Sequence, residues 1–169
     1  MDHLKIANEL LKTKEVFNGL LRDITKEEYL WRPAPDKWCL LEIVCHLYDE
    51  ELEDFRARVK HVLETPDSQM KPNDPPAWVH ERKYIEWDYT ETLNKFLNER
   101  DESVKWLRSL QSPKWDNVYQ HPKMGPLKAE MFLINWPAHD YLHIRQITKY
   151  KFDYLKTVSG DSLNYAGEW

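Results

Sequence analysis

The chain has 169 residues, which is enough for one domain with a substantial core but hardly enough for two. A formal net charge of −5 and scattered lysines and arginines argue against a nucleic-acid-binding surface, and no run of about 18 apolar residues is present that could cross a membrane. Only 4 residues are glycine, which favours helices over a turn-rich β protein, and 8 are tryptophan, which supply a large apolar area.

The N-terminal part of the chain predicts a long helix followed by a stiff connector. Asp2 is suited to cap a helix that runs to about Leu21, because apolar residues recur there at a spacing near 3.6. The segment Thr25–Glu28 has the pattern of a capping box and predicts a short helical turn. Residues 31–38 include Pro33 and Pro35, so this connector cannot continue a helix.

The second predicted helix runs from about Leu40 to Leu63 and contains the first candidate metal ligand. Its apolar residues form one main stripe at helical spacing. At about 100° per residue, His46 and Glu50 fall well away from the middle of that stripe. We therefore expect both side chains to face a groove or solvent.

Two further helices and their connectors complete the predicted architecture. No segment has a convincing strand pattern, and the last helix is apolar on two faces, which indicates a central position. The pattern therefore predicts an all-α four-helix bundle over residues 1–158 and a C-terminal tail over 159–169. The elements in chain order are a proline-rich loop (65–77), an ambiguous segment (78–89), a helix from about Asp88 or Thr90 to Leu110, a connector (111–126) and a last helix (127–158).

Two histidines four residues apart are the strongest chemical signal. On a helix, His139 and His143 share one face with Cβ atoms roughly 5–6 Å apart, a spacing from which two imidazoles can hold one metal ion. If the fold brings His46 to this pair, three neutral nitrogens would hold the metal and leave a coordination position open, as in reactive zinc sites. The alternative is that these histidines are surface or core residues that share the spacing by chance.

Three polar residues near the histidines are candidates for supporting roles. Glu50 lies one turn after His46, so it could orient an imidazole or act as a general base, or it could be an ordinary exposed carboxylate. Gln146 shares the ligand face and could contact substrate or hold a ligand ring, although capping or packing is an equally open interpretation. Asp140 points about 100° away from His139, which favours a salt bridge.

The two cysteines, Cys39 and Cys45, indicate a reducing environment. They lie six residues apart on one predicted helix and cannot pair with each other, and the N-terminus has no signal-peptide layout, so we expect a cytoplasmic location. Nothing near Cys45 is obviously basic enough to favour its thiolate. It is better interpreted as a small buried apolar side chain.

The order and spacing of these motifs resemble the DinB/YfiT-like superfamily. The resemblance rests on Trp38, on His46 in the following helix, on the segment His139–Ile147 and on its lead-in Met124–Leu127, and it covers nearly the whole chain. It implies a four-helix bundle with up-down-down-up topology, often dimeric. It also implies a divalent metal ion held by His46, His139 and His143. Cys39 and Lys128 depart from the family pattern, because a Ser or Thr cap is usual at both helix starts.

The resemblance also indicates a class of chemistry. Family members with known reactions are similar to thiol-dependent transferases and isomerases that use low-molecular-weight thiols such as bacillithiol or mycothiol, and others have been described as metal-dependent hydrolases. The preferred hypothesis is a Zn²⁺- or Ni²⁺-dependent enzyme that transfers a small-molecule thiol to an electrophilic substrate. A metal-dependent hydrolase is one alternative, and a non-catalytic bundle that binds a ligand or partner is another.

Overall fold

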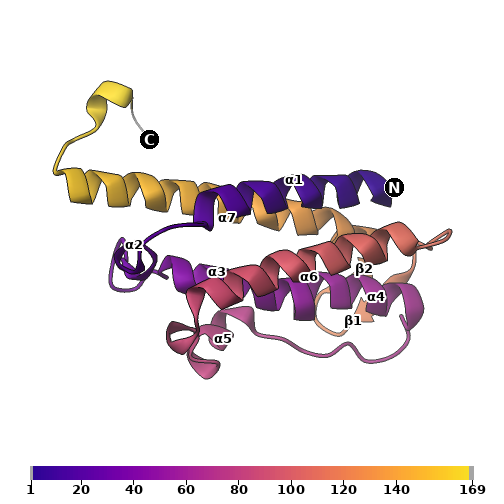
Figure 1. Cartoon of the computed structure of the whole chain (residues 1–169). Helices are drawn as coiled ribbons and strands as arrows, with labels where there is room; N and C mark the ends of the chain where they lie inside the picture. Colours follow the sequence, from indigo (N-terminus) through magenta and orange to yellow (C-terminus); the bar gives the residue numbers. More distant parts are fainter. Residues whose placement is uncertain (1, 168–169) are drawn as a thin grey trace.

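Long helical rods lie side by side along the length of the molecule (Figure 1). The structure is a computed structural model and describes residues 2–167. The four rods are α1, the continuous unit α3–η1–α4, α6 and α7. In chain order the elements are α1 (His3–Leu21), α2 (Lys26–Leu30), α3 (Leu40–Asp49), the π-helix η1 (Glu50–Phe55), α4 (Arg56–Glu64), α5 (Pro75–Glu81), the 3₁₀-helix η2 (Tyr84–Glu86), α6 (Tyr89–Ser109), β1 (Val118–His121), β2 (Gly125–Lys128), α7 (Ala129–Ser159) and the 3₁₀-helix η3 (Asn164–Ala166).

The rods follow an up-down-down-up course. In Figure 1, α1 and α7 run in one direction, whereas α3–η1–α4 and α6 run in the other. α1 contacts both α6 and α7, α6 contacts α3, and α4 contacts α7, so the rods form a closed ring of neighbours. Because α3–α4 and α6 are parallel, the chain must return along the bundle between them, and residues 65–88 make that return. The topology implied by the family resemblance is thus confirmed.

Most helix starts use the caps expected from the sequence. The Asp2 carboxylate accepts a hydrogen bond from the Leu4 N–H at 3.1 Å, and α1 ends at Leu21. The Thr25 hydroxyl oxygen accepts one from the Glu28 N–H at 3.2 Å and begins α2. These bonds satisfy backbone donors that a helix start leaves unpaired, which fixes where each helix begins.

The second predicted helix forms as one rod but with an irregular centre. The π-helix η1 interrupts it between α3 and α4 and places Glu50, Glu51 and Phe55 among the buried residues. A stripe drawn at 3.6 residues per turn cannot anticipate this change, because each π turn contains about one more residue than an α turn. The rod ends at Glu64, close to the predicted end at Leu63.

The expectation of no strands is wrong for one short segment. β1 and β2 pair as an antiparallel hairpin, with Val118 opposite Lys128 and His121 opposite Gly125. The hairpin and the chain just before it also explain how α7 begins without a side-chain cap at Lys128. The Ala129 N–H donates to the Asn117 carbonyl at 3.0 Å, so a backbone oxygen of the connector takes the place of the Ser or Thr cap.

The structure also defines the segments around the proline-rich loop and at the C-terminus. The predicted loop 65–77 ends early, because Asp74 caps α5, which begins at Pro75. The ambiguous segment 78–89 contains most of α5 and the short η2. α7 ends at Ser159 with Gly160 in the left-handed region, at a φ of 67°. The predicted tail follows, although residues 168 and 169 lie outside the described residues, as does residue 1 of the predicted bundle.

A layer of buried polar residues divides the apolar core. Each rod contributes to an apolar cluster on either side of the layer, and the layer itself contains polar residues from all four rods. Within residues 2–167, no helix is long and apolar enough to cross a membrane. The first cluster includes Phe17, Leu21, Leu40, Val44, Leu47, Leu93, Phe96, Leu97 and Ile147, and the second includes Ala7, Leu10, Phe55, Val59, Val62, Val104, Leu107, Leu133 and Trp136.

Candidate metal centre

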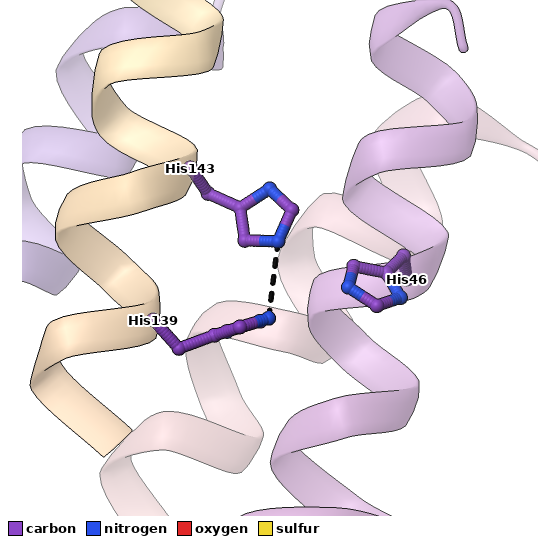
Figure 2. A group of neighbouring side chains, drawn as sticks. All are labelled: His46, His139 and His143. Carbon is purple, nitrogen blue, oxygen red and sulfur yellow. Dashed lines mark hydrogen bonds between the residues drawn. The ribbon is translucent and has the colours of Figure 1, made fainter. Parts of the chain in front are cut away.

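The three candidate histidines meet inside the bundle. His46 comes from α3, and His139 and His143 come from one face of α7 (Figure 2). One ring nitrogen from each residue lies within 4.8 Å of the others, and this is the sole such group of three or more His, Cys, Asp or Glu residues in residues 2–167. The structure therefore brings together the two distant parts of the sequence that the proposed ligand set requires.

The two histidines on α7 approach each other most closely. The Nε2 atoms of His139 and His143 are 3.1 Å apart, as the one-turn spacing on a helix allows (Figure 2). The ring of His46 faces this pair from the neighbouring rod, with centroid distances of 5.5 Å to His139 and 5.0 Å to His143. A cation placed among the three rings would thus have donors from two sides.

The site is more enclosed than the sequence pattern indicated. His46 and Glu50 were expected to face a groove or solvent, but the exposed fractions are only 6% and 5%. The expectation was wrong because it considered one helix alone. The side of α3–η1–α4 that lies off its main stripe packs against α7, where His143 is 9% exposed.

Burial keeps the three imidazoles neutral. Desolvation, followed by the nearby His143 and His139, lowers the pKa of His46 from 6.5 to about 2. Desolvation, followed by His143, lowers the pKa of His139 to about 4. Desolvation also lowers the pKa of His143. A neutral imidazole retains the lone pair that a metal ion needs, so the ligand set is in its binding form at neutral pH without losing a proton.

Gln146 orients one of the rings. Its side-chain oxygen Oε1 lies 2.8 Å from Nδ1 of His143, so Nδ1–H donates to it. In neutral His143 the other nitrogen, Nε2, then has the lone pair, and it is this atom that lies near Nε2 of His139. A hydrogen bond of this kind is the usual way in which a protein fixes the tautomer of a metal-binding histidine. Of the roles considered for Gln146, the structure favours holding a ligand ring.

His46 has no competing partner. Its Nδ1 is buried and forms no hydrogen bond with any residue in the 2–167 range. Buried polar atoms are nearly always paired in folded proteins, so an unpartnered ring in a cluster of histidines needs an explanation. A set of three imidazoles suits Zn²⁺ and Ni²⁺ about equally, so the donor chemistry fits the divalent metal that the sequence predicts.

Aromatic side chains form the walls around the histidines. Trp38 lies beside His46 with a centroid distance of 5.1 Å, and Phe55 lies beside His139 at the same distance. Trp136 on α7 stacks on Phe55 at 6.0 Å. Phe55 lies in the π-helix η1 and is buried, as its place on the apolar stripe predicts. An apolar wall of this kind limits water and lowers the local dielectric constant, which strengthens electrostatic interactions with a bound cation.

Glu50 does not have the properties of a general base. Burial, and next the charge of Asp54, raise the pKa of Glu50 to about 9, so it holds a proton at neutral pH. No hydrogen bond joins Glu50 to the three histidines within the described residues. Asp54, which the sequence did not single out, does act on the site, because its charge, after that of Asp140, raises the pKa of His139. Its carboxylate is held by Arg58 and by the Asn73 amide at 2.9 Å.

Two interpretations of neighbouring residues are confirmed. Asp140 forms a buried salt bridge with Arg100, at 2.5 Å between Nη1 and Oδ2. Cys45 is fully buried, and burial raises the pKa of its thiol, so it is not a reactive thiolate. Cys39 is also buried and free, and burial raises its pKa to about 11.

The lowered pKa values predict acid sensitivity in the metal-free protein. At a pH between the folded-state and unfolded-state pKa of His139 or His46, that histidine is less protonated in the folded state than in the unfolded state. Stability that is present above about 6.5 should therefore be lost as pH falls toward about 4 for His139 and about 2 for His46. Urea unfolding of metal-free protein across this range measures the effect. His139→Gln, which cannot gain a proton, should flatten the pH dependence, and an unchanged slope would contradict the assignment.

Comparison with known proteins agrees with this architecture. The family model described as the DinB superfamily matches residues 9–147. Among solved structures, the chain is similar to YfiT from Bacillus subtilis, described as a probable metal-dependent hydrolase with an unusual four-helix bundle topology. The TM-score is 0.76 at 19% identity, over 94% of this chain and 87% of that chain, a likeness that shows the fold alone. No curated protein matches the sequence significantly. On the extent of the family match, the chain belongs to the DinB superfamily.

Proposed function

We propose that the protein is a metal-dependent enzyme whose divalent cation is held by His46, His139 and His143. The observation that carries the proposal is the meeting of three neutral imidazoles, with ligand atoms within 4.8 Å of one another, at the centre of the bundle. A divalent cation held there would supply positive charge that favours the anionic form of a small ligand at neutral pH.

The donor set favours chemistry over a purely structural role. Structural zinc sites are closed by four protein ligands, whereas catalytic sites have three and keep a position open. Within residues 2–167, no carboxylate or cysteine joins the three histidines as a fourth ligand. The nearby Asp140 is already paired with Arg100, and both cysteines are outside the group. This composition speaks against the non-catalytic alternative.

Thiol transfer is the preferred reaction. The resemblance to thiol-dependent family members supports it, and so does the state of Glu50. Hydrolysis calls for an ionised base to take a proton from water, and the burial that raises the pKa of Glu50 disfavours its ionised form. In thiol transfer, the sulfur of a low-molecular-weight thiol loses its proton to solvent, forms a bond to the electrophilic carbon and displaces the leaving group. The chain's own contribution is to hold the three imidazoles neutral and to enclose them with Trp38 and Phe55.

Hydrolysis remains the second candidate reaction. YfiT, with the same fold, is described as a probable metal-dependent hydrolase. The charges of Asp140 and, next, Asp54 act on His139, and Asp140 is paired with buried Arg100, so Asp54 is the better candidate for a base in a hydrolytic mechanism. The salt bridge of Asp54 with Arg58 and its hydrogen bond from Asn73 oppose this role, because both already occupy Oδ1 of the carboxylate.

Turnover measurements with metal-loaded protein distinguish the two reactions. We expect a small thiol and a chlorinated aromatic electrophile to give thioether and chloride at a rate well above that of metal-free protein, whereas ester and amide panels stay at background. His46→Ala should return thioether formation to the uncatalysed rate, since it removes one of the three ligands. Metal-dependent turnover of an ester or amide without any thiol-dependent reaction would replace transferase by hydrolase.

A further inference from the structure

The polar layer between the two apolar clusters contains a fully buried ion cluster. Arg100, Asp140 and Glu51 are each 1% exposed, and Thr13 beside them is 2% exposed. They come from α6, α7, η1 and α1 respectively, so each of the four rods contributes one member. Charged side chains this deeply buried are rare in proteins unless they are paired, because the loss of hydration is costly.

The contacts within this ion cluster are directional. Arg100 donates to both carboxylate oxygens of Asp140, at 2.5 Å and 2.8 Å, and its Nη2 lies 2.9 Å from Oε2 of Glu51. The Thr13 hydroxyl donates to Asp140 at 2.5 Å. The Trp136 indole N–H donates to Glu51 at 2.9 Å. The planar guanidinium therefore sets both the height and the rotation of α7 relative to η1 and α6.

This ion cluster is adjacent to the candidate metal centre along two rods. Asp140 directly follows His139 on α7, and Glu51 lies five residues after His46 on the second rod. Within the described residues, Gln146 is the one side chain outside the three histidines that is hydrogen-bonded to any of them, and its Oε1 accepts from Nδ1–H of His143. The positions of His46 and His139 therefore depend on how their helices are placed.

Helix placement must be accurate for three imidazoles to share one cation. A shift of one residue moves a side chain by about 1.5 Å along the axis and about 100° around it. Metal–ligand distances tolerate only about 0.2 Å. Apolar cores tolerate many changes of side chain as long as volume and pattern are kept, so apolar packing is less directional than a hydrogen-bonded ion pair. The two hydrogen bonds from the Arg100 guanidinium to the Asp140 carboxylate can form at one relative position of α6 and α7. Any other position would leave a buried charge without its partner.

We propose that Arg100, Asp140 and Glu51 are positioning residues that set the register of α7 against the second rod and so bring His139 and His143 to His46. The proposal rests on the proposed metal site, because it assigns these residues to building that site. It differs from a general contribution to stability, since it predicts a loss of metal geometry even in a variant that folds well.

Titration with Co²⁺ measures both affinity and ligand geometry, the second through the visible absorption bands of the bound ion. We expect Arg100→Lys, which keeps the charge but lacks the planar fork, to weaken Co²⁺ binding by about 10- to 100-fold and to alter the spectrum. A triple variant, Glu51→Leu with Arg100→Met and Asp140→Leu, replaces the charges by apolar groups and is expected to stay folded. It should show the same loss of affinity.

The matched control is Leu107→Ala on α6, which creates a buried cavity in the second apolar cluster without touching the ions. It should lower stability but leave Co²⁺ affinity and spectrum unchanged. Equal loss of affinity in the control, or wild-type affinity and spectrum in folded Arg100→Lys and triple variants, would overturn the positioning role. If the triple variant does not fold, Arg100→Lys and Asp140→Asn decide the outcome in the same way. Failure of the wild-type protein itself to bind Co²⁺ would instead overturn the proposed metal site, and this proposal with it.

Discussion

Purified protein carrying His139→Ala together with His143→Ala should contain no stoichiometric divalent metal, whereas the wild-type protein should contain about one equivalent. The double variant leaves His46 as the single imidazole of the group, and one imidazole cannot hold a divalent ion against water. The loss of affinity should exceed the 10- to 100-fold that follows removal of a residue that merely orients a ligand. Elemental analysis of protein isolated without added metal measures the content directly and also decides between zinc and nickel.

His80→Ala is the matched control for this measurement. His80 is exposed at the end of α5 and belongs to no metal-binding group within residues 2–167. It should leave the metal content unchanged. Full metal content in the double variant would show that the ion binds elsewhere, and absence of metal from the wild type after exposure to Zn²⁺ and Ni²⁺ would exclude the proposed centre.

Arg100→Met should be the most destabilising single substitution of a charged residue in the chain. It leaves Asp140 and Glu51 buried with no cation between them, and breaking a buried pair in this way costs about 3–5 kcal/mol. Urea unfolding at pH 7 measures the change in the free energy of unfolding. A cost of this size is a large fraction of the stability of a domain of this length.

The triple replacement of Arg100, Asp140 and Glu51 by apolar residues is the informative comparison. It removes the charges together, so no unpaired ion remains, and its stability should return close to that of the wild type. Wild-type stability of Arg100→Met alone would mean that solvent reaches the cluster and compensates the carboxylates. That result would contradict the 1% exposure of all three side chains.

Much of the bundle was predictable because its signals are local. Apolar spacing and the Asp2 cap are contained within a few residues, so α1 ends at Leu21 as expected. The pairing of His139 with His143 is equally local, since one helical turn brings them together. The contact of His46 with this pair joins distant parts of the sequence. It was predicted from the order of motifs that resembles the family.

The features that escaped prediction depend on contacts between distant segments. β1 and β2 have four residues each, which is too short for a clear alternating pattern, and the second contains Gly125 and Pro126, which are depleted in strands. Asp140 was expected to form a salt bridge, but its partner was not identified, although Arg100 lies on the apolar stripe of α6, four residues after Phe96 and four before Val104. The burial of Arg100 follows from the packing of four rods around one level of the bundle.

The burial of Glu50 escaped prediction for a different reason. A hydrophobic stripe assumes a constant angle per residue, and η1 breaks that assumption between Glu50 and Phe55. His46 lies before the break, so its position on α3 was judged correctly relative to the stripe. The apolar stripe could not reveal that the polar side of this rod would be covered by α7.

The π turn also has a consequence for evolutionary comparison. A family member that forms the same rod as a regular α-helix needs about one residue fewer between His46 and Arg56. Correct alignment of such a homologue requires a single-residue gap inside a helix, where gaps are normally penalised most. Without that gap, every position of α4 would be paired with the wrong residue.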